Sequence, residues 1–384
     1  MTLAARPTIP AARYATRLAR ATEAVEAADL DAMLVGVGPD LRYLIGYEAM
    51  PLERLTMLVL RRGEPPRLIV PRLELGAAQA GVRTPVEIVT WMETEDPHAL
   101  AVGGLRRGAR VAISDGLAAM HLLPIQDALG GDAARWSLAS AQLRALRMIK
   151  DADEVELLRA AALAADRVVA AISAGRLVGR TEADVAREVR ERLVAEGHET
   201  AQFAIVASGP NAASPHHDAS DRVIAAGEPI VLDIGGTLGG YGSDTTRTLW
   251  VTGGDEARGP DDRFRRLYDV LQQAHTAATA AVAPGVPCEH VDAAARDVIG
   301  AAGYGDAFFH RTGHGIGLEG HEDPYIVAGN ALPLEPGMAF SIEPGIYLPG
   351  EYGARIEDIV ICGDDGPIVL DTVSRDLAIV AGID

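Results

Sequence analysis

The chain has 384 residues, of which 48% are hydrophobic and 23% are charged, the balance of an ordinary soluble protein with two domains or one large one. Its formal net charge of −19 and its lack of a basic run argue against binding to nucleic acid or to an anionic membrane. The N-terminal residues lack the apolar segment of a signal peptide, no apolar stretch could span a bilayer, and the two cysteines are far apart. We therefore expect a cytoplasmic protein with reduced thiols.

The first part of the chain predicts an α/β domain. Residues 17–29 have the pattern of an amphipathic helix, and residues 32–38 read as a buried strand followed by a turn at Pro39-Asp40. Further short apolar runs predict strands near Leu58, Ile69, Val89 and Ile113. Strands that alternate with helical segments are typical of layered α/β structures. A change of composition near Leu146 predicts two domains, residues 1–146 and residues 147–384.

The second part of the chain predicts two pairs of helices separated by glycine-rich strands and turns. The helical patterns cover residues 151–173, residues from Thr181 to a stop at Gly197, residues 264–283 and residues 289–302. A weak repeat follows these pairs. Gly227 begins a short apolar strand with Asp233 six positions later, and Gly337 begins another with Glu343 six positions later. The repeat predicts a duplicated fold with a site at its pseudo-symmetric centre.

Each repeat contains a hairpin that carries two carboxylates. Asp233 ends an apolar strand, Asp244 opens the next one, and a turn around Leu238-Gly239 would place the two directly opposite each other. Glu343 and Glu357 are equidistant from the turn residue Gly350, so the second hairpin is expected to bring them side by side as well.

Carboxylates this close repel each other unless a cation or a proton lies between them. Arg355 lies two residues before Glu357 and should therefore point to the same face of its strand. Aspartates near turns are most often turn formers, but two such hairpins in a duplicated frame, each beginning in an apolar strand, favour a metal site. Four carboxylates and one histidine form an oxygen-rich ligand set for two divalent ions. That set favours Mn²⁺, with Co²⁺, Fe²⁺ or Zn²⁺ as replacements.

Several histidines accompany these hairpins. His310, His314 and His321 lie in one glycine-rich segment, and His216 and His217 lie in the matching loop of the first repeat. A lone histidine would usually be structural, whereas this group predicts one metal ligand together with proton donors or oxyanion stabilisers. The glycines around His314 do not form a phosphate loop, because the lysine and the strand–helix context of such a loop are missing.

At this point the chain resembles the pita-bread metallopeptidases, the group that contains methionine aminopeptidase, aminopeptidase P, prolidase and creatinase. The motifs that carry the resemblance are SGPNAASPHH at Ser208, VLDIGGTLGGYGSDTTRT at Val231, HRTGHGIGLEGHEDP at His310, SIEPGIY at Ser341 and ARIEDIV at Ala354. The N-terminal segment DAMLVGVGPDLRYLIGY is similar to the smaller domain of the prolidase, aminopeptidase P and creatinase branch. The resemblance implies an α/β creatinase-like N-terminal domain and an α+β pita-bread catalytic domain with an internal pseudo-two-fold repeat.

The resemblance also implies roles for individual residues. The five metal ligands would be Asp233, Asp244, His314, Glu343 and Glu357. Glu343 would serve in addition as the general base toward a water or hydroxide that bridges two metals. His216, His310 and His321 would be the family's accompanying histidines, with His321 contacting the substrate carbonyl or the tetrahedral intermediate. Arg355 would hold the carboxylate network.

The implied reaction is hydrolysis of the Xaa-Pro bond in proline-containing peptides, by a chain expected to form a homodimer or a higher oligomer. One departure concerns chain length. Many prolidases have His-Glu-x-Pro-Arg, and their arginine helps to hold the free carboxylate of a dipeptide, whereas this chain has Tyr325 at that position. This departure leaves the chain-length specificity open between a dipeptidase and an aminopeptidase P that acts on longer peptides. The compact N-terminal domain favours the dipeptidase, which is the predicted activity. A catalytically inactive binding module on the same fold is the alternative from another class of protein.

Overall fold

The structure of the protein is a computed structural model that describes residues 7–131 and 134–383. This part of the chain divides into two compact units: one is Ile9–Arg147, and the other comprises the residues from Met148 onward together with those before Ile9. None of its helices combines the length and the apolar character needed to cross a membrane.

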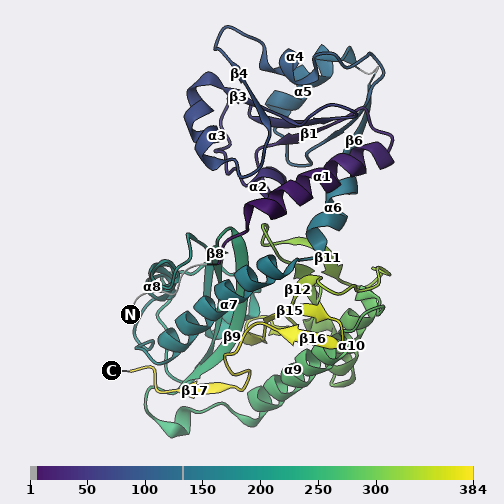
Figure 1. Cartoon of the computed structure of the whole chain (residues 1–384). Coiled ribbons are helices and arrows are strands. Elements are labelled where there is room, and N and C mark those ends of the chain that lie inside the picture. Colours follow the sequence, from purple (N-terminus) through teal and green to yellow (C-terminus); the bar gives the residue numbers. More distant parts are fainter. Residues whose placement is uncertain (1–6, 132–133, 384) are drawn as a thin grey trace. The chain divides into compact units, whose positions relative to one another are not determined.

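The N-terminal unit is built on a six-stranded mixed sheet with the strand order β4-β3-β2-β1-β5-β6 (Figure 1). The strands are β1 (Ala32–Gly36), β2 (Met57–Arg61), β3 (Arg67–Pro71), β4 (Glu87–Trp91), β5 (Arg110–Ile113) and β6 (Arg135–Leu138). The helices are α1 (Ala11–Ala27), α2 (Pro39–Ile45), α3 (Leu75–Gly81), α4 (Pro97–Val102), α5 (Ala119–Ala128) and α6 (Ser140–Met148). Because β1 pairs in parallel with β5 and antiparallel with β2, the sheet mixes both directions. The predicted strands near Leu58, Ile69, Val89 and Ile113 are confirmed.

Two details of this unit differ from the sequence prediction. The first helix begins at Ala11 and not near Arg17. Pro39 and Asp40 do not form an isolated turn, because Pro39 occupies the first position of α2 and Asp40 lies in its first turn. Proline is favoured at that position, since the amide that it lacks has no partner within the helix.

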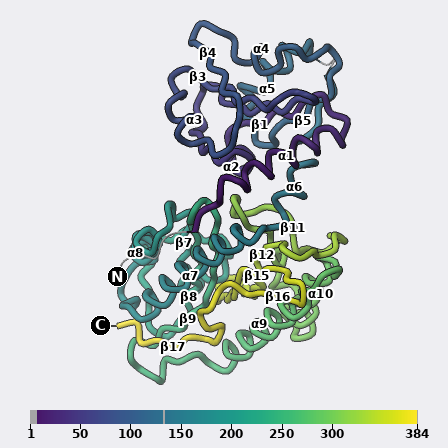
Figure 2. Tube along the Cα trace, in the orientation of Figure 1, coloured from purple at the N-terminus to yellow at the C-terminus, as the bar shows by residue number. Residues whose placement is uncertain are grey.

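The first half of the second unit packs two helices against an antiparallel hairpin sheet. The helices are α7 (Ala152–Ser173) and α8 (Glu182–Ala195), and the strands are β7 (Thr200–Ser208), β8 (Glu228–Leu238), β9 (Tyr241–Val251) and the C-terminal β17 (Ala378–Val380). Asp151 and Thr181 cap the two helices by accepting hydrogen bonds from backbone amides of the first turn. The strand order is β17-β9-β8-β7, and Figure 2 shows β17 alongside β9, with which it pairs in parallel.

The second half repeats this plan with α9 (Asp262–Ala280) and α10 (Cys288–Ala301). Its five-stranded sheet has the order β11-β10-β12-β15-β16. The strands are β10 (Gly313–Gly315), β11 (Glu322–Ile326), β12 (Ala339–Ile342), β15 (Asp358–Gly363) and β16 (Gly366–Val369), and β13 (Gly345–Leu348) and β14 (Tyr352–Arg355) form a separate hairpin. A single β-bridge between Thr246 and Glu357 joins β9 of the first half to the chain just before β15.

Each half has its own apolar core on the helix side of its sheet. Val168, Val185 and Leu232 belong to the first core, and Phe264, Val291 and Phe340 belong to the second. The polar groups of the next subsection therefore lie on the opposite side of the strands, where the two halves meet at the Thr246–Glu357 bridge.

Candidate metal centre

The first pair of candidate ligands lies on the β8–β9 hairpin. The register pairs Gly235 with Asp244 and Asp233 with Thr246, so the two aspartates are diagonal neighbours. The predicted direct opposition of Asp233 and Asp244 is therefore wrong by two residues. Both aspartates also lie inside their strands and not at the strand ends.

The turn explains this shift. It falls at Gly239 and Gly240, which both have positive φ angles of 60° and 85°, the conformation that a two-residue hairpin turn requires. Gly235 also fits the observed register, because a Cβ atom there would lie 2.4 Å from the ring of Phe203 on β7.

The second pair follows the predicted geometry more closely. In the β13–β14 hairpin Gly345 pairs with Arg355, a register centred on Gly350, and its continuation brings Glu343 opposite Glu357. The backbone amide of Glu357 also donates to the carbonyl of Thr246 at 3.1 Å. This hydrogen bond links the second pair to the first hairpin.

His314 enters the same space from β10. Its neighbours must be glycine because the strands approach closely: a Cβ atom would lie 1.8 Å from the Ser341 carbonyl oxygen at Gly313 and 2.3 Å from the Asp323 oxygen at Gly315. The glycines on either side of His314 therefore accommodate neighbouring backbone.

The state of the His314 ring follows from its contacts. Burial and the adjacent His321 lower the pKa of His314 to about 3, so the ring is neutral. Its Nδ1 donates to the carbonyl of Gly315 at 3.1 Å, which leaves Nε2 without a proton. That nitrogen lies 3.6 Å from Asp244 Oδ2 and 3.5 Å from Glu343 Oε1. A lone pair facing two carboxylate oxygens is unfavourable unless a cation lies among them.

The carboxylates show the same need for positive charge. Burial and repulsion from neighbouring carboxylates raise the pKa of Asp244 and Glu357 far above the ordinary values, and burial raises the pKa of Glu343 to about 7. Asp233 Oδ1 is buried and has no hydrogen-bond partner among the residues that the structure describes. These observations fit a group of divalent cations, which would neutralise the carboxylates and occupy the unpartnered oxygen.

The positions of the donor atoms agree with this reading. Three sets of side chains could each hold a metal ion, with donor atoms that all lie within 4.8 Å of one another: Asp233, Asp244 and Glu357; His314, Glu343 and Glu357; and Asp244, His314 and His321. The five residues predicted as ligands are therefore brought together, and His321 stands beside them with its ring centroid 3.8 Å from that of His314.

Behind the carboxylates runs a chain of hydrogen bonds that begins at Arg355. Its Nη2 donates to Asp233, its Nε donates to Thr246 Oγ1 at 3.2 Å, and its Nη1 donates to the Tyr347 hydroxyl at 2.7 Å. The Thr246 hydroxyl in turn donates to Glu357 Oε2 at 2.7 Å. Arg355 therefore contacts both hairpins at once.

His310 belongs to this chain. Its Nδ1 donates to the carbonyl of Arg311 at 2.7 Å, so Nε2 must accept the hydrogen bond from the Tyr347 hydroxyl at 3.0 Å. Both ring nitrogens are thus used within the protein.

Sequence reasoning missed Tyr347 and Thr246. The alternation rule that found Arg355 would have found Thr246, which lies two residues after Asp244 on the same strand face.

The two histidines of the first repeat, His216 and His217, have different contacts. His216 is exposed and lines the cavity beside the carboxylates. His217 also lines it, but its Nε2 lies 2.8 Å from the buried carboxylate of Glu182 at the start of α8. Glu182 was not predicted as part of the site.

The five candidate ligands, the histidines described above and Arg355 line one cavity of about 740 Å³. Phe203, Ile205 and Phe309 supply apolar walls, and His321 and Arg311 supply polar groups near the carboxylates. A cavity with apolar lining residues and a buried cluster of carboxylates and imidazoles can bind a small polar molecule that has an apolar part.

The comparisons with known proteins agree with this geometry. Residues 156–364 match the model of Metallopeptidase family M24, and residues 17–149 match the Creatinase/Prolidase N-terminal domain. The chain belongs to metallopeptidase family M24. The predicted family and the predicted fold class, an α/β creatinase-like domain followed by an α+β pita-bread domain, are confirmed.

Individual relatives cover nearly the whole chain. The probable dipeptidase PepE of Mycobacterium tuberculosis is 49% identical over 372 residues, 96% of each chain. The Xaa-Pro dipeptidase of Lactobacillus helveticus is 34% identical over 88% of this chain and 92% of its own length. The crystal structure of dipeptidase PepE from Mycobacterium ulcerans is 47% identical and has a TM-score of 0.88 over 97% of this chain and 99% of that one. The prolidase from Thermococcus sibiricus is 35% identical and has a TM-score of 0.89 over 96% and 99%.

Proposed function

We propose that this chain is a dinuclear-metal peptidase that hydrolyses the Xaa-Pro bond of dipeptides. The observation that carries the proposal is the convergence of four carboxylates and the unprotonated Nε2 of His314 in one cavity. Whole-length similarity to proteins named dipeptidase, Xaa-Pro dipeptidase and prolidase supports the substrate class.

The proposed metal ligands are Asp233, Asp244, His314, Glu343 and Glu357. Four carboxylates balance the charge of two divalent ions, and their hard oxygen donors favour Mn²⁺, with Co²⁺, Fe²⁺ or Zn²⁺ as possible replacements. When bound, such ions supply Lewis acidity and lower the pKa of water. His314 is the proposed imidazole ligand because it is buried among the carboxylates, whereas His321 is exposed.

The other residues of the cavity would bind and orient the substrate and move protons. Glu343 would accept the proton of the attacking water at a carboxylate oxygen. His321 and His216, which face the cavity, would donate to the oxygen of the scissile carbonyl. Arg355 would hold Asp233 in place, and His310 would act on Arg355 through the hydroxyl of Tyr347.

The apolar residues that line the cavity suit the substrate. Phe203, Ile205 and the 63% exposed Phe309 could cover a proline ring or an apolar side chain and exclude water from the scissile bond. A compact apolar ring next to a charged centre is the combination that an Xaa-Pro dipeptide presents.

The proposal is tested with enzyme purified without chelator and loaded with Mn²⁺. We expect two metal ions per chain by atomic emission and a kcat/KM that is higher for Xaa-Pro dipeptides than for Xaa-Pro-Xaa tripeptides. A tripeptide preference above about tenfold, worth about 1.4 kcal/mol of differential transition-state binding, would favour an aminopeptidase P. Absence of bound metal together with absence of hydrolysis would favour the inactive binding module.

Three further properties complete the proposal. Cys288 and Cys362 are both buried free thiols, which supports a reducing compartment such as the cytoplasm. The domain boundary is proposed between residues 146 and 147, near the end of α6, and limited proteolysis tests it. We also propose a homodimer or a higher oligomer, as in the pita-bread family that the motifs resemble, and sedimentation of the metal-loaded protein tests that assembly.

A further inference from the structure

Two arginines lie among the described residues that line the cavity, and they differ in their partners. Arg355 is 2% exposed and donates to Asp233 and to the Tyr347 hydroxyl, so its charge is already compensated. Arg311 has no carboxylate partner within residues 7–131 and 134–383, and its contacts there are with uncharged rings. The charge of Arg311 acts on the Glu343 carboxylate and lowers its pKa, but no carboxylate of the described residues holds this guanidinium in a direct ion pair.

The position of that guanidinium is defined by two contacts. Its Nη2 lies 3.1 Å from Nδ1 of His321, and its central carbon lies 4.5 Å from the centre of the Tyr325 ring. Guanidinium has no acceptor, so it donates to His321 through one N–H and keeps its other N–H groups for a ligand. Only the His321 ring separates it from His314, since the two imidazole centroids are 3.8 Å apart. The free donors of Arg311 thus lie beside the candidate metal centre.

We propose that Arg311 binds the C-terminal carboxylate of the dipeptide, with Tyr325 as the platform that holds its guanidinium. This inference rests on the proposed Xaa-Pro hydrolysis. It identifies Arg311 as the residue that makes the enzyme select dipeptides over longer peptides. Tyr325 occupies the position at which many prolidases have an arginine. Its ring instead contacts the guanidinium of Arg311. The planar fork of an arginine matches the two oxygens of a carboxylate.

The length of the substrate explains why such a contact discriminates. In a dipeptide the carboxylate carbon follows the proline Cα directly, about 1.5 Å away. In a tripeptide one more residue moves the carboxylate by roughly 3.3–3.6 Å, which exceeds the tolerance of a charge-assisted hydrogen bond. A guanidinium fixed near His321 therefore meets the carboxylate of only one of the two substrates.

The test compares wild type and Arg311→Gln, both loaded with Mn²⁺, on three substrates: an Xaa-Pro dipeptide, its C-terminal amide, and an Xaa-Pro-Xaa tripeptide. We expect Arg311→Gln to lower kcat/KM for the dipeptide by roughly 10- to 100-fold, mainly through KM, because a charge-assisted hydrogen bond is lost. The amide and the tripeptide should change by less than about threefold, since neither places a carboxylate at this point. Arg311→Lys should fall between the two enzymes, because it keeps the charge without the fork.

Two further comparisons separate this role from others. Tyr325→Ala should weaken dipeptide hydrolysis by about 2- to 30-fold, the value of a cation–π contact, whereas Tyr325→Phe keeps the ring face and should stay near wild type. Arg187→Gln changes a 65% exposed arginine on α8 and should leave the selectivity unaltered. Equal losses on the dipeptide and its amide would show that Arg311 acts only by orienting His321, and would overturn this inference while the proposed function stands. A wild-type enzyme that hydrolyses none of the three substrates would overturn both.

Discussion

Replacement of Glu182 by glutamine should destabilise the catalytic unit far more than the same replacement elsewhere on α8. Glu182 is fully buried at the first position of this helix, and its carboxylate accepts hydrogen bonds from Ser208, Asn211, His217 and Ser220. The donors come from the end of β7 and from the loop that follows it. One carboxylate therefore fixes the segment in which His216 faces the cavity.

The magnitude follows from the number of donors at each oxygen. Oε1 accepts from the amide and the hydroxyl of Ser208 at 2.8 and 2.7 Å, and Oε2 accepts from the amide and the hydroxyl of Ser220 at 3.1 and 2.7 Å. Whichever way a glutamine is oriented, its NH₂ group meets N–H and O–H donors. Loss of one partner from a buried charged network costs about 3–5 kcal/mol. For a unit of this size we expect the melting temperature to fall by roughly 6–20 °C.

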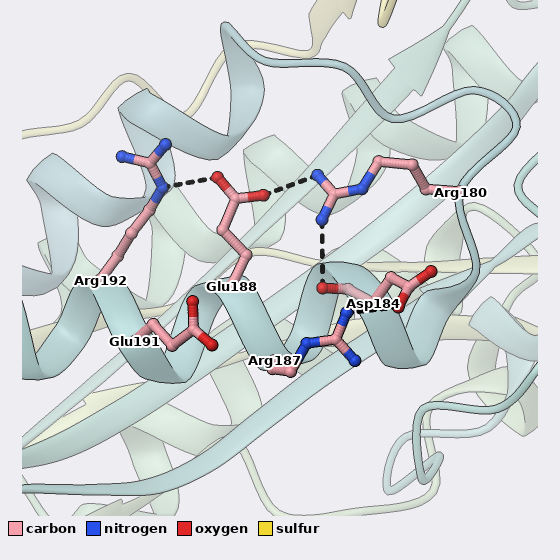
Figure 3. Close-up of a pocket in the computed structure, with 6 residues that line it drawn as sticks. All are labelled: Arg180, Asp184, Arg187, Glu188, Glu191 and Arg192. Atoms are coloured by element: carbon pink, nitrogen blue, oxygen red, sulfur yellow. Dashed lines mark hydrogen bonds and ion pairs between the residues drawn. The ribbon is translucent and has the colours of Figure 1, made fainter.

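The matched control is Glu188→Gln on the same helix. Figure 3 shows Glu188 between Arg180 and Arg192, with ion-pair distances of 2.6 and 2.7 Å and a side chain that is 28% exposed. Surface pairs of this kind are worth about 0.2–1 kcal/mol, so the control should lower the melting temperature by only a few degrees. Circular dichroism of the two variants at pH 7, without metal, gives both values. Equal shifts for Glu182→Gln and Glu188→Gln would refute the reasoning.

The pH dependence gives the same prediction an independent check. Burial alone would raise the pKa of Glu182, but the hydrogen bonds from Ser220, Ser208 and His217 outweigh it and lower the pKa to about 2. The stability that Glu182 contributes is therefore complete above its ordinary pKa of 4.5 and disappears as the pH falls toward 2. The gap in urea midpoint between wild type and Glu182→Gln should narrow below pH 4.5, and a gap that widens there would contradict the assignment.

Three further predictions concern the candidate metal centre. Asp244→Asn should abolish metal binding in an atomic-emission measurement. It should also raise the melting temperature of the metal-free protein, because burial and repulsion from Asp233 and Glu343 raise the pKa of Asp244. An unchanged metal content would contradict this prediction. Burial raises the pKa of Glu343 from 4.5 to about 7, so the folded metal-free protein holds an extra proton between pH 4.5 and pH 7. Its stability should therefore fall as the pH rises through this range. Glu343→Gln should flatten this pH dependence in a series of urea unfolding measurements. Tyr347→Phe removes the hydroxyl between Arg355 and His310 and should lower kcat by roughly tenfold with metal content retained, whereas loss of metal would show that the hydroxyl supports the ligands themselves.

The sequence was informative where a residue's role depends on local periodicity. Alternation along a strand placed Arg355 on the face of Glu357, and the carboxylate six positions after each glycine indicated the two repeated halves. The capping residue Thr181 marked the start of α8, which the structure confirms. These features depend on neighbours within a few positions, and such neighbours are visible in the chain.

Glu182 shows what local patterns cannot predict. In the sequence it is one of several acidic residues in the first turn of a helix, where such residues are common and usually exposed. Its donors lie 26 to 38 positions further along the chain, and only the folding of β7 and its loop onto α8 brings them to it. The same holds for the contact between Arg311 and Tyr325, because β11 must turn back along β10 before the ring can lie under the guanidinium.

The register of the β8–β9 hairpin affects the chemistry of the site, because it sets the spacing of Asp233 and Asp244. The segment between Asp233 and Asp244 contains Gly235, Gly236, Gly239 and Gly240, so several turns were available from the sequence alone. Directly opposed aspartates would have had Cβ atoms about 4.5–5.5 Å apart, a spacing at which carboxylates readily share a proton. The two aspartates are diagonal neighbours in the observed register, and such neighbours are generally about 7–8 Å apart, with a somewhat smaller separation of their Cβ atoms. Their oxygens still come within 4.8 Å of each other and of Glu357, so that the two side chains reach toward a common point from either side. A two-residue shift set by a glycine turn thus favours a cation over a shared proton at this position.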